Sequence, residues 1–99
     1  MEPQLTPQTN VFDAQNRHIR DCLVALTRGV DQLMNAGLTV TALSIEGAYP
    51  RIQVLPSRRC QRLPPATVII KPGPNGGRIA ERSAIVQGCE VRWIDRDYR

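Results

Sequence analysis

A single stripe of apolar residues near the start of the chain constrains the fold more than any other feature. The stripe has five members at successive steps of four, three, four and three residues: Ile19, Leu23, Leu26, Val30 and Leu33. This spacing places them along one face of an α-helix. Asn10 is suited to cap the start of that helix, and Gly37 to follow its end. We therefore predict one long amphipathic helix over residues 11–36 with one buried side.

After Gly37 the pattern changes to short runs rich in β-branched residues, which indicate strands. Five runs follow: 38–46, 49–56, 67–71, 78–86 and 89–94. Within them, alternation places Ile52 and Val54 on one face of the second run, and Cys89, Val91 and Trp93 on one face of the last. Because short connections join most of these runs, hairpins are expected. We predict an α+β fold in which the long N-terminal helix packs on a four- to five-stranded antiparallel sheet.

Polar residues and two prolines occupy the first nine positions. We expect residues 1–9 to form a flexible arm and residues 10–99 to form a single α+β domain.

The glycine-rich segment IIKPGPNGGRIAER, residues 69–82, raises the possibility of a phosphate-binding loop. A P-loop has its lysine after the glycines, followed by Ser or Thr and a helix. Here Lys71 precedes the glycines, and the residues after Arg78 resemble a strand. Without a helix N-terminus, the main source of oriented N–H groups is missing. Asn75-Gly76 is instead a strong hairpin signal, so we predict a turn between two strands.

No group of residues points to catalysis, a metal or a cofactor. His18 and Cys22 share a helix face and, with Cys60 and Cys89, would supply the ligand types of a zinc site. The four are far apart in sequence, whereas structural zinc sites use close pairs such as C-x₂-C. Cys22 and Cys89 are better explained as small buried apolar residues. With a single histidine in the chain, we predict a protein that is not an enzyme and carries no metal or cofactor.

The expected cellular location depends on two kinds of segment, a signal sequence and a membrane span. The start of the chain lacks a basic and apolar signal sequence, and no apolar run approaches the roughly 18 residues of a membrane span. Three widely spaced cysteines do not form a disulfide framework. We expect a cytoplasmic protein with reduced thiols and no membrane partner.

A basic middle segment is the best candidate for function. Residues 47–80 contain six basic residues and no acidic ones, although the whole chain has a net charge of only +4. Arg58, Arg59 and Arg62 lie close together in a proline-bounded loop, and we predict that they bind a partner. Arg51, Lys71 and Tyr49 are secondary candidates. The partner is an acidic protein surface or, alternatively, nucleic-acid phosphates.

Two further hypotheses stay open, one for this segment and one for the whole protein. One is that the arginines belong to a solvated loop without a partner. The other is that the protein is an assembly factor that oligomerises through a sheet edge. For direct nucleic-acid binding, the four aromatic residues of the chain give thin support, because stacking needs exposed rings.

Two runs, LMNAGLTVTALSIEGAYPRIQV and GCEVRW, resemble small uncharacterised proteins encoded by phages and prophages of proteobacteria. The shared features span roughly residues 30 to 94 and are typical of a fold rather than of a site. The resemblance implies an accessory protein that acts in the bacterial cytoplasm on a host or phage protein or ribonucleoprotein complex. Proteins of this kind include anti-defence inhibitors such as anti-CRISPR proteins.

Overall fold

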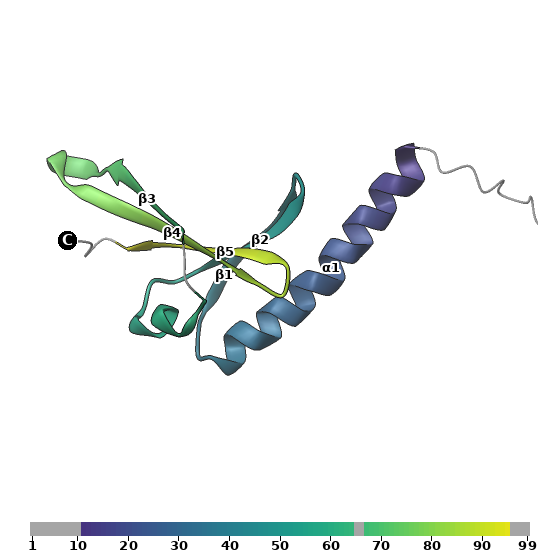
Figure 1. Ribbon diagram of the computed structural model, residues 1–99, viewed down its shortest axis with the longest axis horizontal. Helices are drawn as coiled ribbons and strands as arrows, with labels where there is room; N and C mark the ends of the chain where they lie inside the picture. The colour runs from purple at the N-terminus through teal and green to yellow at the C-terminus, as the bar shows by residue number, and fades with distance from the viewer. Residues whose placement is uncertain (1–10, 65–66, 96–99) are drawn as a thin grey trace, which may run out of the picture.

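The computed structural model describes residues 11–64 and 67–95 (Figure 1). The predicted arm over residues 1–9, the proposed cap Asn10 and residues 96–99 lie outside the described part. One long helix precedes five strands and two short 3₁₀ helices: α1 Val11–Asn35, β1 Val40–Glu46, β2 Tyr49–Val54, η1 Arg58–Arg62, β3 Thr67–Pro72, η2 Pro74–Gly76, β4 Arg78–Val86 and β5 Cys89–Asp95. The predicted α+β class is confirmed.

Helix α1 ends where Gly37 was expected to end it. Gly37 has a φ of +83°, in the left-handed region that glycine adopts at low cost. Its amide donates to the Met34 carbonyl (2.9 Å), and the Leu38 amide donates to the Leu33 carbonyl (2.9 Å). These two bonds form a Schellman motif, which satisfies carbonyls at the helix end. The side chains of Leu33 and Leu38 are both buried, so the motif also directs the chain into the core.

The buried face of α1 is displaced slightly from the predicted stripe. Cys22, Leu26 and Leu33 are buried, and Gly29 is buried between them. Leu23, which the stripe placed in the core, is 53% exposed, so that part of the prediction is wrong. The sheet approaches the helix closely at Gly29, where an added Cβ would stand 3.0 Å from Ile52 Cδ1, and Leu23 lies outside this contact face.

The five strands form one sheet in the order β1-β2-β5-β4-β3. Most neighbours are antiparallel, but β2 and β5 are parallel, with Arg51 opposite Glu90 and Gln53 opposite Arg92. The sheet is therefore mixed, which corrects the prediction of a purely antiparallel one. After β2 the chain does not turn back beside that strand. It passes through η1 to the far edge of the sheet, and the place next to β2 is taken by β5.

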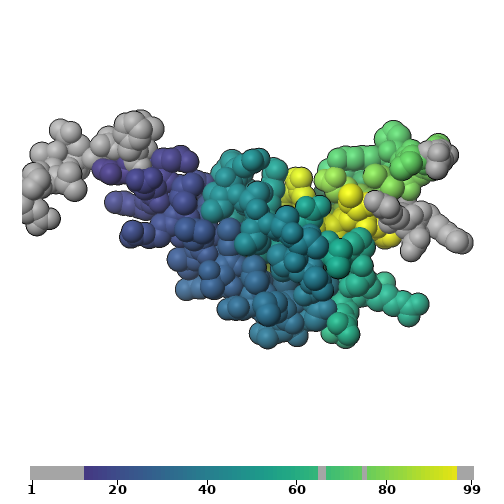
Figure 2. Space-filling view, turned by 180° about the vertical axis from the view of Figure 1, so that it is seen from behind, coloured from purple at the N-terminus to yellow at the C-terminus, as the bar shows by residue number. Residues whose placement is uncertain are grey.

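Helix α1 packs on one face of the sheet, over β1, β2 and β5. The predicted core positions on β2 and β5 are confirmed, because all five are buried: Ile52, Val54, Cys89, Val91 and Trp93. The β3–β4 hairpin extends away from α1 to the opposite end of the molecule (Figures 1 and 2). All six residues of β3 are exposed. The helix therefore covers only part of the sheet.

The glycine-rich segment connects β3 to β4 as a hairpin, as predicted. The Gly73 amide donates to the Gly77 carbonyl across the turn (2.7 Å), and Gly76 has a φ of +75°. The connection contains the short helix η2, and strand β4 follows it directly. In the described part of the chain, no helix has the length and apolar character that a membrane crossing requires.

Candidate partner-binding surfaces

The strand residues that alternate with the core positions lie on the face of the sheet opposite α1, which we call the open face. Strand alternation and the pairing register assign the following residues to it: Ala42, Ser44 and Glu46 on β1; Tyr49, Arg51 and Gln53 on β2; Glu90, Arg92 and Ile94 on β5; Ile79, Glu81, Ser83 and Ile85 on β4; Thr67, Ile69 and Lys71 on β3. Among the residues the structure describes, no helix packs on this side.

Five charged side chains form a continuous series of ion pairs across the open face, which we call the charged row. Arg51 Nε lies 4.0 Å from Glu90 Oε2 on β5. Arg92 pairs with Glu90 through its Nε and with Glu81 through its Nη1, at 3.6 Å from Glu81 Oε1. Lys71 Nζ completes the row at 2.8 Å from Glu81 Oε2. The row thus joins β2, β5, β4 and β3.

The cations of the charged row are more exposed than its carboxylates. Side-chain exposure is 41% for Arg51, 37% for Arg92 and 49% for Lys71, against 20% for both Glu81 and Glu90. The hydrogen bond from Lys71, with the nearby charges of Lys71 and Arg92, holds the pKa of Glu81 below its ordinary value. Glu81 therefore stays ionised at neutral pH. The charged row therefore exposes its cations to solvent, and each cation is paired with a less exposed carboxylate.

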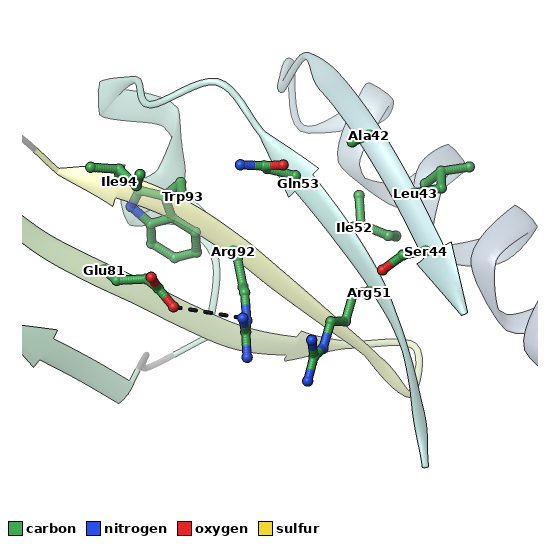
Figure 3. Close-up of a pocket in the computed structure, with 10 residues that line it drawn as sticks. All are labelled: Ala42, Leu43, Ser44, Arg51, Ile52, Gln53, Glu81, Arg92, Trp93 and Ile94. Carbon is green, nitrogen blue, oxygen red and sulfur yellow. Dashed lines mark ion pairs between the residues drawn. The ribbon is translucent and has the colours of Figure 1, made fainter. Parts of the chain in front are cut away.

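A small pocket lies beside the charged row. Its volume is about 270 Å³, and strands β1, β2, β4 and β5 supply its lining. Figure 3 shows Arg51 and Arg92 projecting on the same side of the sheet, with Arg92 joined to Glu81. Ligand sites for drug-sized molecules usually measure about 300–1,000 Å³. The hollow lies just below that range, so it is small for a drug-sized ligand.

The arginine-rich loop forms η1 and lies against the C-terminal end of α1. Arg59 Nη1 donates to the Gly37 carbonyl (3.0 Å), and Arg62 Nη1 donates to the Ala36 carbonyl (3.1 Å). The last turn of α1 has no basic residue of its own. The two guanidinium groups therefore supply the positive charge that a helix C-terminus favours. Arg59 and Arg62 have a structural role, in addition to any role in binding.

The six residues predicted to bind a partner occupy two separate surfaces. Tyr49, Arg51 and Lys71 lie on the open face, where Tyr49 is 57% exposed. The loop arginines lie at the end of α1, and only Arg58 has no hydrogen bond or ion pair with the described residues.

Sequence analysis missed three members of the charged row: Glu81, Glu90 and Arg92. They lie after the acid-free segment, residues 47–80. For Glu90 and Arg92, the sequence signal that could have found them is the period-2 alternation of β5. It places Glu90 and Arg92 on the face opposite Cys89 and Val91.

His18, Cys22 and Cys60 contact neighbouring groups of the fold. His18 Nε2 lies 3.0 Å from the Gly47 carbonyl oxygen and 3.6 Å from Cys22 Sγ. Cys60 is buried in η1, with its Sγ 3.8 Å from the Leu55 carbonyl oxygen. Over residues 11–64 and 67–95, no three His, Cys, Asp or Glu side chains gather as metal ligands would.

Kinship provides no assignment for these surfaces. Comparisons with known protein families, with curated proteins and with solved structures find no match to this chain.

Proposed function

We propose that this chain is a non-enzymatic binding protein whose open face docks on an acidic surface of a protein or ribonucleoprotein complex in a host cell. The charged row carries the proposal, because its three cations are exposed above half-buried carboxylates. Glu81 and Glu90 restrict the positions of the cations before a partner arrives. Less side-chain freedom is then lost on binding.

Apolar groups at the margins of the open face support a macromolecular partner. Tyr49 is 57% exposed and Leu55 is 51% exposed. Tyr49 follows the alternation of β2 that places Arg51 on this face, and Leu55 comes directly after the last residue of β2. Aromatic residues and arginine are the side chains that most often anchor protein interfaces. Tyr49 and Arg51 are therefore the proposed anchors of the interface.

Nucleic-acid binding is the second candidate, and the structure favours it at a different surface. In the charged row, Glu81 and Glu90 alternate with the cations and would repel a phosphate backbone. On η1, Arg58 is exposed and belongs to a segment without acidic residues. A phosphate strand would therefore bind along η1, whereas an acidic protein surface would bind the open face.

The cellular context of the proposal rests on the resemblance to phage-encoded proteins. On that basis the partner is a complex of the bacterial cytoplasm, and the chain is an inhibitor carried by a phage. A CRISPR effector or another defence complex is the first partner to test.

The test compares two variants that change the net charge equally. R51A/K71A removes the two outer cations of the charged row, and R20A/R28A removes two exposed arginines of α1. Tagged proteins are used to capture partners from a bacterial lysate, with and without nuclease. We expect wild type and R20A/R28A to retain the same nuclease-resistant complex, and R51A/K71A to lose it.

Two results would contradict the proposal. If R51A/K71A is folded and still keeps the complex, the open face is not the interface. If the captured material is nucleic acid that nuclease removes, the second candidate replaces the first. In that case R58A should weaken binding more than R51A, and log K should fall linearly with log salt.

A further inference from the structure

Strand β3 is an exposed and apolar edge of the sheet. Its three central residues, Val68, Ile69 and Ile70, are 39%, 50% and 47% exposed. Strand β4 pairs with one side of β3, and no described strand pairs with the other. The backbone N–H and C=O groups on that side are available to another strand.

The usual defences of an edge strand are weak here. Proteins block such edges with prolines, inward-pointing charges, bulges or a covering element. Residues 67–71 contain no proline, and the pairing of β3 with β4 shows no bulge. Their one charge, Lys71, is engaged by Glu81 of the same sheet. Helix α1 packs over β1, β2 and β5, at the other end of the sheet (Figure 1).

We propose that β3 is a self-association surface, through which two copies of this chain pair antiparallel about a two-fold axis at Ile69. Each copy then contributes five strands to one continuous sheet, with the β3 strands at its centre. The two open faces lie on the same side of that sheet.

The sequence of β3 is complementary to itself in this register. Ile69 faces Ile69 of the second copy on the open face, while Val68 faces Ile70 on the opposite face. Lys71 faces Thr67, which avoids placing two ammonium groups directly opposite each other. Pro72, which has no N–H to donate, lies outside the paired segment.

A register centred one residue later, at Ile70, gives less favourable pairs of facing residues. It would place Ile69 opposite Lys71 and Val68 opposite Pro72, so that an apolar residue meets a charge and a proline enters the ladder. The Ile69-centred register is therefore the one to test.

The first experiment is sedimentation of the purified chain over a range of concentrations up to roughly 1 mM. A pair of short strands buries less than the standard interface of about 1,600 Å², so a concentration-dependent dimer is expected. I69K should shift the protein to monomer, because the two lysines would face each other across the axis. I85K is the matched control, because Ile85 is 55% exposed but lies on β4. It should dimerise like wild type.

A second experiment tests the register. In the proposed pairing, I69C brings two thiols to facing positions and should form a disulfide-linked dimer under mild oxidation. K71C faces Thr67 and should cross-link far less. The three native cysteines are buried and provide a low background. A wild-type chain that stays monomeric, or an I69K variant that still dimerises, would overturn the proposal. Cross-linking through I70C rather than I69C would overturn the register.

Discussion

Gly29 of α1 lies so close to Ile52 of β2 that an added Cβ would stand 3.0 Å from Ile52 Cδ1 and 3.2 Å from Cys89 Sγ. Ile52 and Cys89 are fully buried, so both would have to shift within the core to accommodate the added atom. Glycine inside a helix costs about 1 kcal/mol relative to alanine. At this position the cost is offset by the close approach of helix and sheet.

We predict that G29A destabilises the fold although it improves helix propensity. The new methyl group overpacks a full core, which typically costs about 1–3 kcal/mol and exceeds the propensity gain of about 1 kcal/mol. Urea denaturation would measure the free energy of unfolding.

A double-mutant cycle supplies the control for G29A. I52V removes the methyl group nearest to the added Cβ and should by itself cost about 0.5–1.5 kcal/mol. In the G29A background the same change should cost less, or stabilise the protein. Additive effects of the two substitutions would show that the contact at Gly29 is not strained.

The arginines on η1 should contribute to stability through the end of α1. Removing the guanidinium group of Arg59 or Arg62 leaves the Gly37 or Ala36 carbonyl without its donor. Each alanine substitution should cost about 0.5–1 kcal/mol, since these contacts are exposed. Thermal unfolding would detect the loss. R58A makes the same chemical change one residue away and should leave the melting temperature unchanged; equal losses in all three variants would refute the capping role.

Stability should depend on pH through Glu81. Its folded-state pKa is lowered, first by the hydrogen bond from Lys71 and then by nearby cations. The resulting stabilisation is present above the unfolded pKa of about 4.3 and is lost as the pH falls through the folded-state pKa. E81Q should therefore be less stable than wild type at neutral pH, and the difference should shrink in acid. Urea midpoints across this range would show it; a constant difference would contradict it.

The cysteine thiols should be protected in the native state. Burial, and to a smaller degree Cys22, raises the pKa of the Cys89 thiol, so less thiolate is present to react. Cys22 and Cys60 are buried as well. We expect slow labelling by a thiol reagent in buffer and rapid labelling of all three residues in denaturant. Fast native labelling at Cys89 would indicate that α1 separates readily from the sheet.

Local structure was predictable because its causes lie close together in sequence. The helix follows from the spacing of Leu26 and Leu33 and from Gly37 after its end. Alternation around Ile52 and Val91 indicates which side of each strand is buried. Strand order has no such local signal. The parallel pairing of β2 and β5 depends on where η1 leads the chain, and a hairpin rule could not anticipate it.

The candidate site was predictable only in part, for a similar reason. The distribution of charged residues along the sequence indicates Arg51 and Lys71, because they lie in an acid-free segment. It does not find Glu81 and Glu90, whose positions between the cations depend on strand register. Nor does it separate Arg58 from its neighbours Arg59 and Arg62, because the helix-end carbonyls that bind those two belong to a segment more than twenty residues earlier.

Strand β5 follows the other four strands in the chain but lies at the middle of the sheet, between β2 and β4. A nascent chain that has emerged only as far as β4 contains two hairpins with nothing between them, and α1 has only part of the surface it packs against. Because the closing contacts join distant parts of the sequence, folding must wait for residues 89–95 and is expected to be slow for so small a protein. Truncation before Cys89 would therefore remove the centre of the fold rather than shorten an edge.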